Sequence, residues 1–323
     1  MTQHALLFFA GVALLVMGGR LLVAASVDTA RRLGVPPLVV GLTLVAWGTS
    51  APELALNLVS AFKDRGDLAL GNVVGANICN MALVLGISAL IRPLAVEMRL
   101  LKIEVNLNVL ILGSLAALGI FLGLPMWASG AMLGTFLVYS AWTIIAAMRA
   151  PRQDAAGIGA TSDPAVALPM SWLRIAGAFV LGLTLLSLGG TLASDAASAI
   201  AVALGVPPAV VGVTIVSIGT TLPEMVTSVL AVRKGQTDLA LGNALGSCLF
   251  NAGAIFGLAG LISPPDVGAD MQVPMVYMAV LALVLVVITR THGRTIARIE
   301  GAMLLLSYAA FLTYAALTVQ RTP

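Results

Sequence analysis

Charged residues are scarce in this chain of 323 residues. Lys and Arg number 17 and Asp and Glu number 14, so charged residues make up 10% of the chain, against about 25% in soluble domains. So few charges cannot cover the surface of a soluble protein of this size. Hydrophobic residues reach 59%, which is typical of an integral membrane protein. This composition excludes a disordered chain, a coiled coil and a disulfide-rich secreted scaffold, and we expect no nucleic-acid partner.

The residues that usually carry enzyme chemistry are also few. The two cysteines, Cys79 and Cys248, lie inside apolar runs, and we interpret them as buried thiols. The two histidines, His4 and His292, lie at the ends of apolar segments. The sequence has no phosphate-cradling loop and no pairing of a nucleophile with a base. We therefore expect no cofactor, no ATP-driven pump and no enzyme.

Long apolar segments fill most of the sequence. A membrane-spanning helix needs about 20 mostly apolar residues, and ten segments satisfy this length. They lie near residues 5–27, 37–62, 68–91, 103–124, 127–148, 174–198, 208–232, 239–262, 272–289 and 299–318. The loops that follow the odd-numbered spans carry 13 Lys and Arg, and the opposite loops and the C-terminal tail carry three. The positive-inside rule then places both termini on the outer, periplasmic side of a cell inner membrane.

The sequence contains an internal repeat. A shift of 171 residues aligns residues 11–91 with 182–262 without a gap, with 34 identities in 81 positions. Five predicted spans separate the copies, and because five is odd the copies must cross the membrane in opposite senses. Inverted repeats are typical of secondary transporters. We therefore predict an all-α integral membrane fold of ten helices in two inverted five-helix repeats, 1–149 and 174–323, joined by a cytoplasmic linker, 150–173.

Glu53 and Glu224 are the carboxylates that the sequence places deepest in the predicted spans. Each ends a Gly-Thr-x-x-Pro-Glu element, in spans 2 and 7. Proline lacks an N–H, so the carbonyl four residues earlier loses its hydrogen-bond partner, and we predict that helices 2 and 7 are broken here. No basic residue lies in spans 2, 3, 7 or 8 to form an ion pair with either glutamate. Carboxylates, hydroxyls and free carbonyls are the oxygen ligands that hard cations such as Ca²⁺ require.

The following spans, 3 and 8, add repeated polar residues. Both carry Gly-Asn-x-x-Gly and then an asparagine, Asn80 or Asn251. The spaced glycines favour close helix packing. The asparagine carbonyl oxygens are candidate cation ligands, and interhelical hydrogen bonding is the alternative interpretation.

These duplicated motifs resemble the cation/Ca²⁺ exchanger superfamily, and most of all its prokaryotic Na⁺/Ca²⁺ antiporters. In that family, paired glutamates bind Ca²⁺ and Na⁺ alternately at the membrane centre. Matching motif positions implies a ligand set of Glu53, Thr49, Ser50 and Asn80 from the first repeat, Glu224, Thr220, Thr221, Ser247 and Asn251 from the second, and the backbone carbonyls of Ala46 and Ser217. Ala76 departs from the family pattern, which has serine there, and Asn251 stands where some relatives carry aspartate.

The expected function is a secondary antiporter that exchanges Ca²⁺ for Na⁺ by alternating access. Ca²⁺/H⁺ exchange stays open as the alternative, because a carboxylate in a low-dielectric site also binds protons. An intramembrane hydrolase is a more distant alternative, since no second acid lies on a neighbouring span. The expected partners are Ca²⁺, Na⁺ (H⁺ under the alternative) and the lipid bilayer, with no obligate protein partner.

Overall fold

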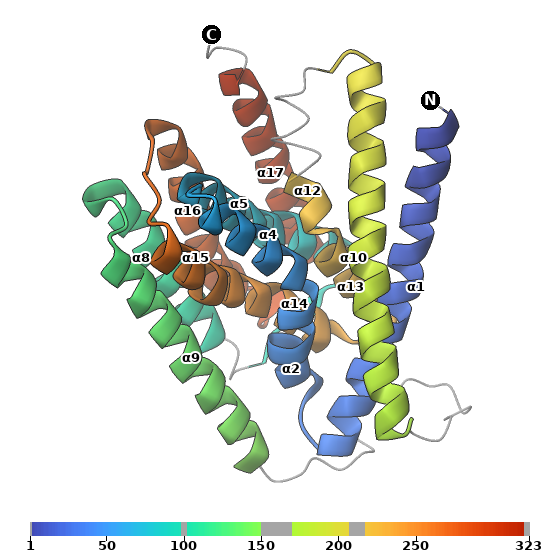
Figure 1. The fold of residues 1–323 in the computed structure, drawn as a ribbon. Coiled ribbons are helices and arrows are strands. Elements are labelled where there is room, and N and C mark those ends of the chain that lie inside the picture. The colour runs from blue at the N-terminus through green and yellow to red at the C-terminus, as the bar shows by residue number, and fades with distance from the viewer. Residues whose placement is uncertain (1, 98–101, 150–169, 207–216, 320–323) are drawn as a thin grey trace.

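Two long helices stand beside a group of shorter, broken ones in the computed structural model (Figure 1). The structure describes residues 2–97, 102–149, 170–206 and 217–319. The part before the linker forms α1 (Thr2–Leu33), α2 (Pro37–Val40), η1 (Gly41–Val45), α3 (Ala46–Thr49), α4 (Ala51–Phe62), α5 (Gly66–Ile78), η2 (Cys79–Val84), α6 (Leu85–Ile91), β1 (Leu94–Ala95), α8 (Glu104–Leu122) and α9 (Met126–Arg149). Most of the predicted linker, 150–173, lies outside the described residues.

The part after the linker repeats the order of the helices from α3 to α6. It forms α10 (Trp172–Ala203), α12 (Ser217–Thr220), α13 (Leu222–Arg233), α14 (Thr237–Leu249), η4 (Phe250–Ile255), α15 (Phe256–Ile262), η5 (Ala269–Met271), α16 (Gln272–Ile288), β2 (Thr295–Ile296) and α17 (Arg298–Val319). Segments η1, η2 and η4 are π-helical, and η5 is a short 3₁₀ turn.

The helices are suited to a membrane. Within the described ranges, eight are long and apolar enough to cross it, or nine if the bent pair Pro37–Thr49 and Ala51–Phe62 counts as one span. Large apolar side chains such as Phe121 and Leu173 are 80% and 84% exposed, which suits contact with lipid. The protein is therefore a multi-pass membrane protein. The count of ten stays a prediction, because residues 207–216 of predicted span 7 are not described.

The two sequence copies have matching element boundaries. A shift of 171 residues carries α3, α4, α5, η2 and α6 onto α12, α13, α14, η4 and α15, with the same first and last positions in each case. The duplication in the sequence is therefore also a duplication of local structure, including the π-helical segments.

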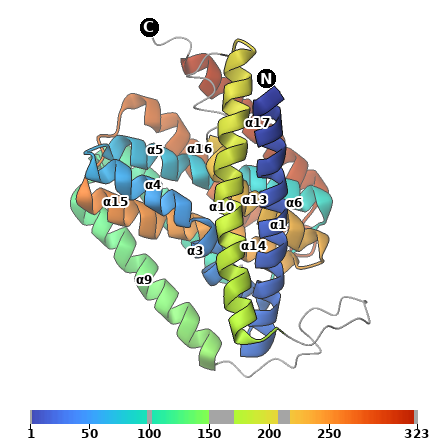
Figure 2. The ribbon, with the colours of Figure 1, turned by 45° about the vertical axis from the view of Figure 1, so that its right-hand side comes forward.

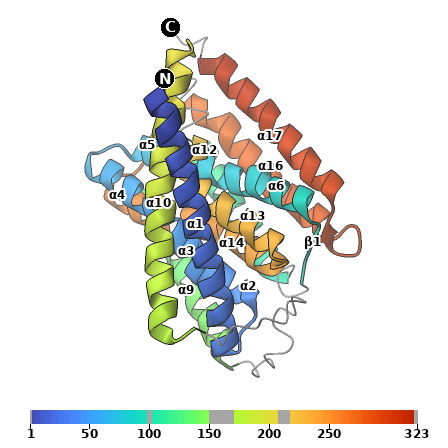
Figure 3. The ribbon, with the colours of Figure 1, turned by 90° about the vertical axis from the view of Figure 1, so that its right-hand side faces the viewer.

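The long helices α1 and α10 run antiparallel and lie side by side in all three views (Figures 1, 2 and 3). A Cβ atom added to Gly11 would lie 2.8 Å from the Gly189 carbonyl oxygen, and one added to Gly18 would lie 2.7 Å from the Gly182 carbonyl oxygen. Because the repeat relates Gly11 to Gly182 and Gly18 to Gly189, these contacts are reciprocal, as a two-fold axis between the copies requires. The opposite orientation of the complete halves in the membrane stays a prediction.

The fold also contains a small ribbon that the sequence did not predict. Strands β1 and β2 pair antiparallel, with Leu94 opposite Ile296 and Ala95 opposite Thr295 (Figure 3). The ribbon joins the connection after α6 to the connection before α17. The fold is otherwise helical throughout the described residues, which confirms the predicted class.

Candidate ion-binding site

The predicted helix breaks lie at equivalent residues of the two copies. Ser50 separates α3 from α4 with φ −87° and ψ 7°, and the helices on either side of it are bent by 47°. Thr221 separates α12 from α13 with φ −90° and ψ 1°. Pro52 and Pro223 occupy the second position of their helices. A backbone N–H at this position has no partner within the helix, so proline costs no helical hydrogen bond there. The break of helix 2 is confirmed, and helix 7 is broken at the matching residue within its described part.

The two glutamates lie in the first turns of the helices that follow these breaks. Glu53 in α4 is 2% exposed and Glu224 in α13 is 1% exposed. The positive end of each helix dipole stabilises a carboxylate at this position. Among the described residues neither glutamate forms an ion pair. Two buried like charges without a counterion are costly, so the site is suited to a cation.

Hydroxyl groups connect the two copies at the break. The Ser50 hydroxyl donates to Glu224 Oε1 at 2.8 Å and lies 3.1 Å from the Ser247 hydroxyl. The structure thus brings together three predicted ligands from the α3–α4 break, α13 and α14. The Thr49 hydroxyl, at the end of α3, lies 3.3 Å from Asn243 Oδ1 and 3.4 Å from the Ala46 carbonyl oxygen.

The predicted amide ligands lie in the π-helical segments. Asn80 is the second residue of η2, and Asn251 is the second residue of η4. Segment η2 packs against α13, which carries Glu224, and η4 packs against α4, which carries Glu53. Each asparagine therefore lies beside the helix that carries the glutamate of the other copy. Segments of this kind are frequent at functional sites.

Four buried oxygen atoms in this region have no hydrogen-bond donor among the described residues. They are Oε2 of Glu53, Oε2 of Glu224, Oδ1 of Asn80 and Oδ1 of Asn251. The repeat relates the first to the second and the third to the fourth. A buried acceptor without a partner costs on the order of 1–3 kcal/mol, and a bound cation would remove this cost. Within the described ranges no group of three or more His, Cys, Asp or Glu residues gathers, so such a cation site depends on mixed oxygen ligands.

The remaining predicted ligands lie on α3 and α12 or at their ends. Ala46 begins α3, and its carbonyl oxygen accepts hydrogen bonds from the Ser50 N–H at 3.1 Å and from the Thr49 hydroxyl. Ser217 begins α12 at the equivalent position. Thr220 is half-buried and Thr221 is buried. The ligand roles of these four residues, like those of the other predicted ligands, stay predictions.

Asn243 is a site-supporting residue that the sequence interpretation did not single out. Its Nδ2 donates to the Glu224 carbonyl oxygen at 3.2 Å and to the Ser228 hydroxyl at 2.9 Å. In the other copy, Asn57 Nδ2 donates to the Glu53 carbonyl oxygen at 2.7 Å. Side-chain amides therefore hold the backbone of both glutamates. The repeated Gly-Asn pair on spans 3 and 8 was the sequence signal that could have identified Asn243.

Glu104 is a third buried carboxylate, which the sequence interpretation did not single out. It begins α8 and is fully buried. The Tyr139 hydroxyl donates to Glu104 Oε1 at 3.3 Å. Asn108 Nδ2 donates to the Glu104 carbonyl oxygen at 3.0 Å and to the Leu245 carbonyl oxygen at 3.3 Å. This cluster ties α8 and α9 to α14, two residues before Ser247.

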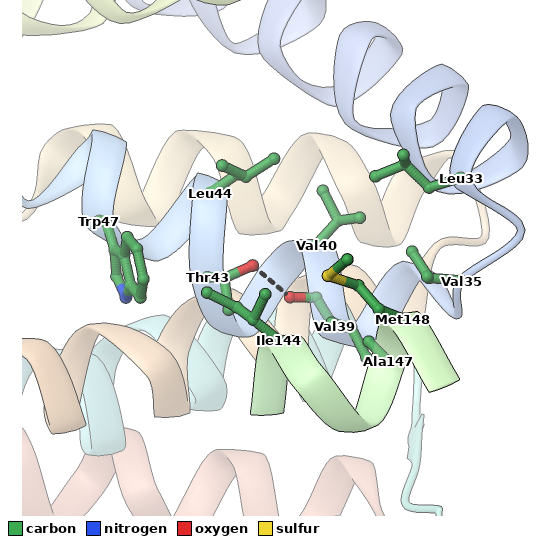
Figure 4. A pocket seen from close by; sticks show the side chains of 10 residues that line it. All are labelled: Leu33, Val35, Val39, Val40, Thr43, Leu44, Trp47, Ile144, Ala147 and Met148. Carbon is green, nitrogen blue, oxygen red and sulfur yellow. Dashed lines mark hydrogen bonds between the residues drawn. The ribbon is translucent and has the colours of Figure 1, made fainter. Parts of the chain in front are cut away.

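An apolar groove of about 410 Å³ lies beside the α2–η1–α3 segment, between it and α9 (Figure 4). It is lined by Leu33, Val35, Val39, Val40, Thr43, Leu44, Trp47, Ile144, Ala147 and Met148. The Thr43 hydroxyl donates to the Val39 carbonyl oxygen at 2.7 Å within its own helix. The lining offers no carboxylate, so this groove is not an ion site.

One known protein family matches both halves of the chain. A family model described as "Sodium/calcium exchanger protein" matches residues 3–145 and 174–317, one block in each half of the chain. The chain belongs to this family. Its members and structural neighbours are transporters rather than enzymes, and the family has no cofactor-binding fold.

Several relatives of this exchanger family extend over most of the chain. The putative antiporter CaxA of Alkalimonas amylolytica is 34% identical over 310 residues, which cover 93% of this chain and 95% of CaxA. The inner membrane protein YrbG of Escherichia coli (strain K12) is 31% identical over 81% of this chain and 80% of its own length. The solved structure of the sodium-calcium exchanger NCX_Mj, soaked with Na⁺ and Sr²⁺, superposes with a TM-score of 0.81 at 27% identity, covering 97% of this chain and 98% of NCX_Mj.

Proposed function

We propose that this exchanger exports Ca²⁺ in exchange for Na⁺ at a site centred on Glu53 and Glu224. Cation/Ca²⁺ antiport follows from the family, and the choice of Na⁺ as the coupling ion is our proposal. The observation that carries it is the set of four buried, repeat-related oxygens without hydrogen-bond donors, two of which belong to carboxylates without a described counterion. One Ca²⁺ neutralises the two carboxylates, and the asparagine oxygens complete its contacts.

Competition for one set of oxygens couples the two ions. If Ca²⁺ and Na⁺ use the same carboxylates, the site cannot hold a full complement of both. Binding of several Na⁺ then releases Ca²⁺, and alternating access to the two membrane faces converts this competition into exchange. The hydroxyls of Ser50 and Ser247 beside Glu224 favour Na⁺ over H⁺, because proton transfer needs no surrounding oxygen cage. Structures of NCX_Mj soaked with Na⁺ and Ca²⁺ support the same pair of ions.

We place the protein in a cell inner membrane with both termini on the periplasmic side. The supporting observations are the 13-to-3 distribution of Lys and Arg, the similarity to an E. coli inner membrane protein, and the position of the start of α1 and the end of α17 on one side of the fold (Figure 1). An alkaline phosphatase fusion after α17 should be active in bacteria, and a green fluorescent protein fusion there should be dark. The reverse result would contradict this orientation.

Uptake of ⁴⁵Ca²⁺ into proteoliposomes tests the coupling ion. Vesicles loaded with Na⁺ and diluted into Na⁺-free medium should take up ⁴⁵Ca²⁺, and collapsing the Na⁺ gradient with a sodium ionophore should stop the uptake. A proton gradient of equal size, acid inside and without Na⁺, should drive little uptake. Uptake driven by the proton gradient alone would replace Na⁺ with H⁺ in this proposal.

A further inference from the structure

Asn77 has a buried side-chain amide without a hydrogen-bond partner in the described part of the chain. It lies in α5, its exposure is 0%, and neither Oδ1 nor Nδ2 is paired with a described residue. Because both atoms are unpaired, this observation does not depend on which way the amide is turned. Buried amides in folded proteins are almost always paired with protein groups, water or ions. An unpaired one in a transporter therefore points to a ligand that the amide meets during the transport cycle.

The internal repeat shows that the two halves supply oxygen at different positions of this helix. Ser247, whose hydroxyl lies 3.1 Å from that of Ser50, is equivalent to Ala76, which has no hydroxyl. At the next position the second half has Cys248 and the first half has Asn77. The oxygen that the first half lacks at residue 76 is thus present one residue later, on an amide.

Asn77 lies among the elements that form the candidate site. It precedes Asn80 by three residues, a spacing that makes two side chains neighbours on a helix surface. The backbone carbonyl oxygen of Asn77 lies 3.9 Å from Cys248 Sγ, and Cys248 directly follows Ser247. Helix α5 also packs against η4, which carries Asn251. Asn77 therefore lies where α5 and α14 meet, among the elements that carry predicted ligands of both halves.

We propose that Asn77 Oδ1 is a ligand for transported Na⁺, taking the place of the hydroxyl that Ala76 lacks. This inference rests on the proposed exchange of Ca²⁺ for Na⁺. Na⁺ is the expected ion because the two glutamates already neutralise one Ca²⁺, whereas additional monovalent ions depend on neutral oxygens. Loss of this oxygen weakens Na⁺ binding more than Ca²⁺ binding.

Displacement of bound ⁴⁵Ca²⁺ by Na⁺ from the purified protein measures this effect. Displacement from the wild type tests the proposed function first, and its absence would reject that function before any variant is compared. In Asn77→Leu, which keeps the volume without polar atoms, the Na⁺ concentration for half-displacement should rise roughly tenfold, the effect of one charge-assisted contact. Ca²⁺ affinity measured without Na⁺ should stay close to that of the wild type.

Rescue separates an ion ligand from a packing role. The double variant Ala76→Ser/Asn77→Leu restores an oxygen at the position equivalent to Ser247, so it should regain the wild-type response to Na⁺. Cys248→Ala, at the equivalent position of the other half, is the matched control and should leave the response unchanged. An unchanged response in Asn77→Leu, or a double variant that folds but does not regain Na⁺ sensitivity, would overturn the inference. If Asn77→Leu fails to fold, Asn77→Ala replaces it in both the single and the double variant, and the same two outcomes decide.

Discussion

At the residue scale, the site depends on two carboxylates that are buried without a basic partner in the described part of the chain. Glu53 and Glu224 lie in the first turns of α4 and α13. A side-chain amide donates a hydrogen bond to the backbone carbonyl oxygen of each, from Asn57 to Glu53 and from Asn243 to Glu224. The backbone that carries each carboxylate is consequently held in place before an ion arrives. Pre-positioned ligands of this kind bind a cation without further ordering of the chain.

Replacing either glutamate should abolish Ca²⁺ transport. In Glu53→Gln or Glu224→Gln the site keeps its size but loses one of its two negative charges. At an effective dielectric constant of about 20, two unit charges 4 Å apart interact by about 4 kcal/mol, which is enough to prevent divalent binding. Asp195→Asn, which removes an exposed carboxylate from α10, is the control and should keep transport. Substantial ⁴⁵Ca²⁺ flux in a folded glutamine variant would remove these residues from the ligand set.

Asn243 should contribute to both stability and ion affinity. Asn243→Leu leaves the Glu224 carbonyl oxygen and the Ser228 hydroxyl without their amide donor, which costs on the order of 1–3 kcal/mol. We expect a lower melting temperature in detergent and weaker Ca²⁺ binding. Thermal unfolding monitored with and without Ca²⁺ checks both effects. A melting temperature equal to that of the wild type would show that these hydrogen bonds do not support the site.

At the element scale, the broken helices place the candidate ligands, and the α1–α10 pair packs against them. The breaks at Ser50 and Thr221 place hydroxyls, carbonyls and carboxylates next to one another in the interior. The glycines of α1 and α10 let the two long helices approach until their backbones touch. Helix α10 also packs closely against both breaks. A Cβ atom added to Gly48 would clash with Leu183, and one added to Gly219 would clash with Ser194, and both of these residues belong to α10. A displacement of α10 would therefore act sterically on the residues at both breaks.

Gly189→Ala should disrupt the pairing of α1 and α10. The added Cβ would lie 2.7 Å from the Gly11 carbonyl oxygen, a backbone atom that no side-chain rotation can move away. Overpacking of this kind costs about 1–3 kcal/mol, and we expect reduced thermal stability together with slower transport. Gly177→Ala on the same helix meets no atom within 4 Å and serves as the matched control. Equal behaviour of the two variants would contradict the close-contact role of Gly189.

At the scale of the whole molecule, much of the architecture could be predicted because the chain is duplicated. The 171-residue shift, found in the sequence, recurs in the boundaries of five pairs of elements. The glycine and proline that precede each glutamate predicted the positions of the helix breaks at Ser50 and Thr221 to within three residues. These features are local or repeated, so a single sequence displays them.

Other features depend on contacts between distant segments, which the sequence does not display. Glu104 begins an apolar run, and its hydrogen bond from the Tyr139 hydroxyl comes from another helix, 35 residues further along the chain. The π-helical segments have no local signature, and the β1–β2 ribbon pairs residues about 200 positions apart. The missing partners of Asn77 also emerge only once all neighbouring helices are in place.

Exchange should be independent of K⁺ and should respond to voltage. Two carboxylates balance one Ca²⁺, and Asn80 and Asn251 add oxygens without charge, so a K⁺ bound beside Ca²⁺ would leave an uncompensated positive charge. More than two Na⁺ must return for each Ca²⁺ to drive strong uphill transport, so each turnover moves net charge. Vesicle flux should survive replacement of K⁺ by choline and should change under a valinomycin-clamped potential. A requirement for K⁺, or flux indifferent to voltage, would contradict this charge balance.

The most direct test of a shared site is equilibrium binding of ⁴⁵Ca²⁺ to the purified wild-type protein over a series of Na⁺ concentrations. We predict that Na⁺ displaces Ca²⁺ completely, that the displacement curve is steeper than that for a single competing ion, and that choline at the same concentration has no effect. Ca²⁺ that stays bound at saturating Na⁺ would show that the two ions occupy separate sites, and would contradict the central claim.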